Sequence, residues 1–208
     1  MTRDTELCYK TRMETALKDY REALEKQNFS GDTSTLVMGE GPAPALLMLI
    51  GEAPGAQEVL AGKPFVGKAG KQLDDFLQST GLDRQSLYVG NAVKYRPTNP
   101  KGSANRTPSK KEIDLGRPLL LAEIAFVQPQ VIVSLGNSPL YAITQDKNLR
   151  IGDVHGESIS WEGRVLFPLY HPASVIYNRG LVETYKEDVK RVKQYVDSLK
   201  EDCAREGQ

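Results

Sequence analysis

Three short segments of the sequence carry side chains that can bind and polarise a substrate. Glu52 lies in the motif GEAPG at residues 51–55, Asn91 lies in the motif VGNAVK, and His171 opens the motif HPAS at residues 171–174. A carboxylate can hold a water molecule, a carboxamide can donate one hydrogen bond and accept another, and an imidazole can donate a hydrogen bond to developing negative charge. Each motif is weak by itself, so its meaning depends on whether the fold brings the three together.

Each of these side chains comes at the end of a predicted strand or just after one. Apolar runs predict strands at residues 45–51, 87–93 and 130–135. Residues 157–161 and 164–169 flank Glu162 and Gly163, which is typical of a hairpin. Residues 51–70 hold five glycines and two prolines, and we expect them to be too broken for any regular element.

Helices are expected between these strands and at both ends of the chain. Helical spacing of apolar residues predicts them at residues 4–27, 71–80, 109–127, 136–143 and 181–200. Ser109 and Glu112 form a capping-box signal for the third helix, and the Gly116 to Pro118 segment is where that helix would break.

The alternation of strands and helices predicts an α/β fold. We expect three αβα layers around a central, mainly parallel sheet of four strands. The carboxyl ends of parallel strands lie at one edge of a sheet, so Glu52, Asn91 and His171 are expected in a common crevice.

Composition limits what kind of protein this is. The chain has 208 residues, 39% hydrophobic and 26% charged, which excludes a disordered or membrane-spanning protein and predicts one domain over residues 1–208. Residues 1–30 are expected to be a helical extension packed on that domain. No secretory signal is recognisable, so a cytoplasmic location is expected. Two cysteines, Cys8 and Cys203, exclude a disulfide framework and a cysteine-held metal site.

Net charge identifies one candidate binding segment. Lys plus Arg and Asp plus Glu both number 27, but residues 94–117 hold seven basic and two acidic residues, a net charge of plus five. Such a segment can bind phosphates, or it can be a solvated loop and helix start.

The motifs GEAPG, GKPFVG at residues 62–67, NAVK at residues 91–94 and HPAS occur in this order. Together they resemble the uracil-DNA glycosylase superfamily, closest to its family 4, over residues 45–196. The resemblance implies a monofunctional enzyme that flips uracil out of DNA and excises it hydrolytically. Free uracil and an abasic site would be the products, initiating base excision repair. It implies uracil-containing DNA as partner, no membrane and a monomer.

The resemblance also assigns roles in catalysis and uracil recognition. His171 would donate a hydrogen bond to uracil O2, where negative charge gathers as the base leaves, and Glu52 would order the pocket and its water. Asn91 would accept from N3–H and donate to O4, a pattern that cytosine cannot satisfy.

Four further residues would complete the uracil pocket. Phe65 would stack on the flipped ring, Glu58 would stand as a wall against the methyl group of thymine, and Gly51 and Ala53 would line the pocket. Ala53 stands where the best-known relatives carry an aspartate that helps position water. Hydrolysis here would therefore depend on stabilising the uracil anion, with the water held by backbone groups or by Glu52.

A set of loop residues is expected to contact DNA. Ser174 would bind a phosphate, either Val175 or Ile176 would wedge into the base stack, and the loop after the first strand would approach the phosphates. The full set is Pro54, Gly55, Lys68, Lys94, Arg96, Pro172, Ser174, Val175 and Ile176. His155 has no motif role, and we expect it to be structural.

The sequence departs from family 4 at the positions of its iron-sulfur cluster. Those enzymes hold the cluster with four cysteines, whereas Tyr95 and Gly116 stand at two of the corresponding places here and Cys8 has no paired neighbour. We therefore expect no cofactor and no metal, with ordinary packing around Tyr95 in that region.

Two other functions remain open from the sequence. The first is a catalytically impaired protein of the same fold that binds uracil-containing or single-stranded DNA, suggested by Ala53 and the missing cysteines. The second is an α/β enzyme that acts on a free nucleotide or nucleoside.

Overall fold

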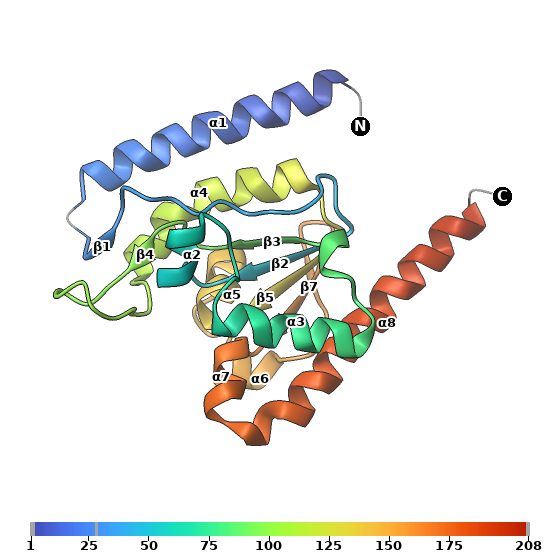
Figure 1. The fold of residues 1–208 in the computed structure, drawn as a ribbon. Helices are drawn as coiled ribbons and strands as arrows, with labels where there is room; N and C mark the ends of the chain where they lie inside the picture. The colour runs from blue at the N-terminus through green and yellow to red at the C-terminus, as the bar shows by residue number, and fades with distance from the viewer. Residues whose placement is uncertain (1–2, 28, 207–208) are drawn as a thin grey trace.

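The computed structural model describes residues 3–27 and 29–206 and has the predicted three-layer α/β fold (Figure 1). Its central sheet has five strands in the order β3-β2-β5-β7-β6. They are β2 (Leu47–Gly51), β3 (Tyr88–Asn91), β5 (Val131–Leu135), β6 (Ile159–Trp161) and β7 (Arg164–Leu169). Neighbouring strands are parallel except for β6, which pairs antiparallel with β7.

The prediction of four strands was wrong by one. The extra strand, β6, is the first arm of the hairpin that Glu162 and Gly163 signalled, and it adds to the edge of the sheet. Both turn residues have positive φ, 45° for Glu162 and 74° for Gly163, as a tight turn between twisted strands requires. A separate two-stranded sheet pairs β1 (Gly31–Asp32) with β4 (Arg96–Pro97).

Helices cover both faces of the sheet (Figure 1). They are α1 (Arg3–Glu25), α2 (Ala56–Ala61), α3 (Lys68–Thr80), α4 (Lys110–Val127), α5 (Asn137–Thr144), α6 (Ile151–Val154), α7 (Pro172–Tyr177) and α8 (Val182–Glu206). Short 3-10 helices occupy Arg84–Ser86 and Arg179–Leu181. None of the helices in the described part of the chain is long and apolar enough to span a bilayer.

Three local predictions were tested by these bounds. The expectation that residues 51–70 hold no regular element was wrong, because they contain α2 and the start of α3, each preceded by an extended glycine at its N-cap. Helix α4 begins with the predicted capping box of Ser109 and Glu112 and runs without a break through Pro118. Helix α3 ends at Thr80, as predicted, and Gly81 follows it in the left-handed conformation.

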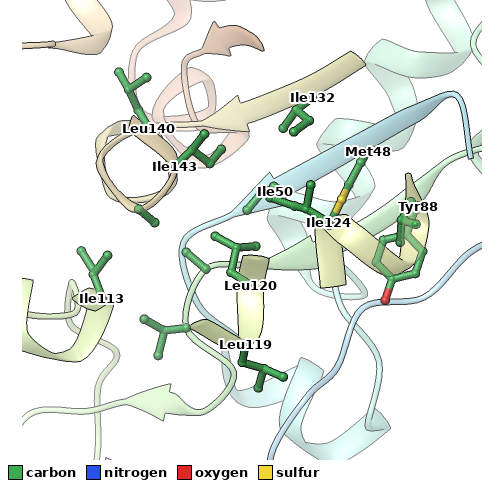
Figure 2. Packing of buried hydrophobic residues seen from close by; sticks show 14 of the residues in the cluster. Met48, Ile50, Tyr88, Ile113, Leu119, Leu120, Ile124, Ile132, Leu140 and Ile143 are labelled. Atoms are coloured by element: carbon green, nitrogen blue, oxygen red, sulfur yellow. The ribbon is translucent and has the colours of Figure 1, made fainter. Parts of the chain in front are cut away.

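Alternate residues of the parallel strands pack on opposite faces of the sheet. Met48 and Ile50 of β2 belong to the core beneath α4 and α5, whereas Leu47 and Leu49 belong to the core beneath α3 and α8. Figure 2 shows the first core, in which isoleucine and leucine side chains of α4 and α5 surround Met48 and Ile50. Both faces of β2 are therefore buried, which fixes the position of its carboxyl end.

Helix α1 packs on the outer side of α4, where Tyr20 and Leu24 are buried in the same core (Figure 1). The amphipathic helix predicted at the N-terminus thus contacts α4 through its apolar residues. The other side of the sheet is covered by α3 and the long helix α8.

Candidate active site

The loops that follow β2, β3 and β7 meet around one open cavity of about 540 Å³. Glu52, Phe65, Asn91 and His171 all line it. Gly51 and Asn91 are register partners at the ends of β2 and β3, so the side chains that follow these strands start from neighbouring positions. The prediction that Glu52, Asn91 and His171 share one crevice is confirmed.

His171 is held in one tautomer by the helix that it caps. It is the N-cap residue of α7, and its Nδ1 accepts a hydrogen bond from the backbone N–H of Ala173 at 3.1 Å. An accepting Nδ1 places the ring proton of a neutral imidazole on Nε2. Burial lowers the pKa of His171 to about 4, so the ring is neutral at pH 7. The site therefore offers an uncharged N–H donor.

Glu52 is fixed by a serine that none of the sequence motifs contains. Its Oε2 accepts a hydrogen bond from Ser138 Oγ at 2.6 Å. Burial raises the pKa of Glu52, while the Ser138 hydrogen bond lowers it in part. Ser138 lies in the first turn of α5, just beyond β5. Because the predicted strand at residues 130–135 also ends at this edge of the sheet, the sequence could have indicated that residues just after it lie near Glu52.

Gly51 leaves room for two recognition side chains. A Cβ atom at this position would lie 2.4 Å from Phe65 Cζ and 2.6 Å from Asn91 Oδ1. Asn91 is buried, and no hydrogen bond to its carboxamide comes from the residues that the structure describes. Its carbonyl and amide groups are thus available to a ligand, beside the edge of the Phe65 ring.

Phe65 adopts a strained backbone conformation that its neighbours hold in place. Its φ is 55°, a region that bulky residues rarely occupy. Arg84 donates hydrogen bonds to the carbonyl oxygens of Pro64 and Phe65 while it pairs with Asp74. A Cβ at Gly70 would lie 1.9 Å from the Phe65 oxygen, so only glycine permits this approach. The ring is stacked near His171, with centroids 6.3 Å apart.

Glu58 ties together the loop that carries Phe65. Its Oε2 accepts from the N–H of Gly55 at 3.1 Å, and its Oε1 accepts from the N–H groups of Val66 and Gly67 at 3.1 and 2.7 Å. The side chain also lines the cavity. The structure thus assigns Glu58 a loop-bracing contact, and its role as a wall against thymine stays a prediction.

Three residues expected at the DNA surface are buried instead, and these predictions are corrected. Lys94 has no exposed surface and pairs with Glu123. Pro172 and Val175 lie on the inner face of α7, where Val175 packs in the core beneath α3 and α8. Residues this deeply buried in the fold cannot reach phosphates or bases without unfolding their surroundings.

The other residues of the expected DNA set have more accessible positions. Pro54, Gly55, Lys68 and Ile176 line the cavity, as does Ala53. Arg96 lies just outside it, where its Nε donates to Asn105 Oδ1 at 2.6 Å, and Ser174 is partly exposed on α7. Phosphate contact by these residues stays a prediction.

An aromatic residue that no sequence motif indicated lies at the mouth of the cavity. Tyr177 lines the cavity at the end of α7 and is 90% exposed, while its neighbour Ile176 is 39% exposed. Helical spacing over residues 172–177 could have indicated this, because a helix with Val175 on its inner face has Ile176 and Tyr177 on its outer face.

Arg106 organises the basic segment beside the cavity. Its guanidinium donates to both oxygens of the buried Glu112, at 2.7 and 2.8 Å, and also to the carbonyl oxygens of Ser30 and Thr98. Burial would raise the pKa of Glu112, but hydrogen bonds from Arg106, Tyr95 and Ser109 outweigh it and hold that pKa at about 2. Part of the basic segment is therefore an internal brace.

The residues at the cluster positions do not fit thiolate ligation. Tyr95 is fully buried, stacks on Phe29 and donates its hydroxyl to Glu112, which confirms the expected packing around it. A Cβ at Gly116 would lie 2.9 Å from the Ala92 carbonyl oxygen. Cys8 is exposed, the side chain of Cys203 lies outside the described residues, and no cluster of metal-ligand side chains occurs among those described. The absence of a cofactor stays a prediction.

His155 has the structural contacts expected of it. Its Nδ1 pairs with Asp188 Oδ2 of α8 at 2.8 Å, and its ring packs on Tyr170. It therefore joins α8 to the strand that leads to His171.

Comparisons with known proteins agree with this geometry. A family model described as the uracil DNA glycosylase superfamily matches residues 38–200. The chain is similar to a Type-4 uracil-DNA glycosylase of Thermotoga maritima, with 36% identity over 78% of this chain and 84% of that protein. It is similar to those of Saccharolobus solfataricus, with 37% identity over 78% and 76%, and Archaeoglobus fulgidus, with 37% over 75% and 79%.

Proposed function

Because the chain belongs to the uracil DNA glycosylase superfamily, we propose that it removes uracil from DNA by hydrolysis and leaves an abasic site. The proposal is supported above all by the convergence of His171, Asn91 and Phe65 on one cavity. A site for an extruded pyrimidine requires a neutral hydrogen-bond donor, a carboxamide that both donates and accepts hydrogen bonds, and an aromatic ring for stacking.

His171 is proposed to stabilise the leaving base. As the N1–C1′ bond breaks, its electron pair stays with uracil and negative charge gathers on O2. Nε2–H of His171 would donate to that oxygen, and the fixed Nδ1 contact means that the ring needs no reorientation. Donors of this kind contribute about 3–4 kcal/mol to transition-state stabilisation.

Glu52 is proposed to orient the attacking water. Its Oε2 is bound by Ser138, and Oε1 accepts no hydrogen bond from the residues that the structure describes. Oε1 would hold the water that adds to C1′ and would receive its proton. With Ala53 in place of a carboxylate, Glu52 is the acidic side chain in this motif that can do so.

Asn91 and Phe65 are proposed to select uracil. The Asn91 carbonyl would accept from N3–H and its amide would donate to O4, while cytosine would present the opposite polarity and leave buried groups unpaired. Phe65 would stack on the ring. Gly51 makes this recognition possible, because any side chain there would displace both groups.

Ile176 and Tyr177 are proposed to hold the gap that base flipping leaves. Both line the cavity mouth and are exposed, unlike Val175. Apolar and aromatic side chains that enter a base stack compensate part of the cost of unstacking. Lys68 and Arg96 would supply phosphate attraction, so binding should weaken as salt concentration rises.

The test is excision from an oligonucleotide that contains one uracil. The wild type should release uracil and leave a strand that breaks only after alkali treatment, as a monofunctional enzyme does. His171→Ala should lower the rate by about 10²–10³-fold, from the energy of one donor, with DNA affinity nearly unchanged. His155→Asn changes the only other histidine and is the matched control. A wild-type protein that yields no alkali-labile site under any salt condition contradicts the proposal.

A further inference from the structure

We infer that Lys94, held by Glu123, is a positioning residue for Asn91 and so contributes to uracil recognition. The inference rests on the proposed function. Lys94 Nζ donates to the backbone carbonyl oxygen of Asn91 at 2.6 Å and to Glu123 Oε2 at 2.6 Å. The side chains of Lys94 and Glu123 have no exposed surface. The ammonium thus acts inside the fold, on the residue whose side chain lines the cavity.

Glu123 is itself fixed from several directions. It lies on α4, on the side of the sheet opposite α3, and its Oε1 accepts from Tyr88 Oη at 2.9 Å and from the N–H of Gly39 at 3.0 Å. Burial and the nearby carboxylate raise the pKa of Tyr88, so its hydroxyl remains a donor. The carboxylate therefore has a single position, and the Lys94 ammonium that binds its other oxygen is fixed as a result.

Contacts fix the backbone of Asn91 on both sides. On its N-terminal side, Asn91 is the last residue of β3 and the register partner of Gly51. On its C-terminal side, the ammonium holds its carbonyl oxygen, while Ala92 and Val93 donate to the carbonyl oxygens of Gly51 and Glu52. The orientation of a carbonyl group reports the ψ angle of its own residue. When this carbonyl group is fixed, the position of the Asn91 carboxamide depends only on the side-chain torsion angles.

A buried ion pair is a poor explanation for stability alone. Removing two charges from water costs about as much as their attraction returns, and neutral replacements often leave a fold as stable as before. A neutral donor would also satisfy the Asn91 carbonyl oxygen. What the pair adds is a strong, directed contact that holds the peptide after Asn91 at one orientation. Displacement of a binding group by about 1 Å can lower a rate by about 10²-fold.

The test removes both charges at once. In Lys94→Met/Glu123→Gln, the glutamine carbonyl can still accept from Tyr88 and Gly39, so the fold should persist, as measured by the thermal unfolding temperature. We expect uracil excision under single-turnover conditions to slow by about 10- to 100-fold and its ratio to cytosine excision to fall. Lys186→Met/Glu183→Gln removes an exposed pair of the same residue types on α8 and is the matched control.

A readout without a base distinguishes positioning from general damage. Affinity for DNA that carries a stable abasic-site analogue should equal that of the wild type, because no uracil is present for Asn91 to bind. Glu123→Gln alone keeps the contact of Lys94 with the Asn91 carbonyl oxygen but removes the charge partner of Lys94. Its excision rate should lie between those of the wild type and the double variant, which gives a second test if the double variant unfolds.

Three outcomes would overturn the inference, and they can be told apart. If the wild type excises uracil and both variants match its rate and its preference over cytosine, the positioning role is wrong and the proposed function stands. Equal losses of uracil excision and abasic-site affinity would show a structural role only. If the wild type excises no uracil, the proposed function fails first and the inference fails with it.

Discussion

The protonation state of His171 is the feature on which the proposed chemistry most depends, and it can be measured directly. Lowering the pH from 8 to 4 should leave the ring neutral over most of that range, because burial lowers its pKa to about 4 from the usual 6.5. At 1.36 kcal/mol per pKa unit, this difference corresponds to about 3 kcal/mol in favour of the neutral form.

The same difference makes stability depend on pH in a defined direction. Between pH 6.5 and 4 the unfolded chain takes up a proton at this position while the folded chain does not, so the free energy of unfolding should decrease as the pH falls. Relative to His171→Gln, the wild type should lose up to about 3 kcal/mol over this interval. Above pH 6.5 the two proteins should show the same pH dependence.

The assay is nitrogen-15 NMR of the imidazole rings. The chain has two histidines, so His155→Asn leaves only the signals of His171. We expect a titration midpoint near pH 4, with the proton on Nε2 above it, because Nδ1 accepts from the N–H of Ala173. A midpoint near 6.5, or a proton on Nδ1 at neutral pH, would refute the reasoning about both burial and tautomer.

Three further predictions concern Gly51, Asn91 and Glu112. Gly51→Ala should lower the uracil excision rate by at least tenfold, since its Cβ would lie 2.4 Å from Phe65 Cζ. The control, Gly152→Ala, changes an exposed glycine and should keep the wild-type rate. Equal rates for the two variants would contradict the packing argument. Asn91→Asp should slow uracil release because an ionised carboxylate cannot donate to O4, as measured by single-turnover excision; a wild-type rate would exclude this contact. Glu112 has a pKa of about 2, below its unfolded value of 4.5, so the wild type should lose about 3 kcal/mol of stability as the pH falls from 4.5 to 2. Glu112→Gln should not show that loss when the free energy of unfolding is measured by chemical denaturation. Parallel curves of stability against pH for the two proteins would contradict this prediction.

Much of the architecture was predictable because it depends on local sequence signals. Apolar runs identified β2, β3 and β5, since a strand buried on both faces must be apolar throughout, and the hairpin signal at Glu162 and Gly163 identified β7. The cap of α4 at Ser109 and the end of α3 at Gly81 follow from hydrogen bonding and backbone sterics within a few residues. The short helix α2 was missed because neighbouring glycines masked its pattern and none of its residues is buried.

The meeting of Glu52, Asn91 and His171 was also predictable, since parallel strands place their following loops at one edge of the sheet. The chemical type of each group was therefore determined by the sequence, together with its approximate place. The contacts that set the state of each group were not, because they come from residues far along the chain. Ser138 lies 86 positions from Glu52, and Glu123 lies 29 positions from Lys94.

Lys94 illustrates the limit most clearly. Its residue type and its basic neighbours indicated a phosphate contact, and nothing local distinguishes an exposed lysine from one that faces a carboxylate across the core. The sequence by itself determined four strands of the central sheet, β2, β3, β5 and β7, and the three groups at or just after their ends. Only the tertiary structure decided which cations are buried, which tautomer His171 adopts and which face of α7 lines the cavity. These depend on burial and on partners that the folded chain alone brings within hydrogen-bonding distance.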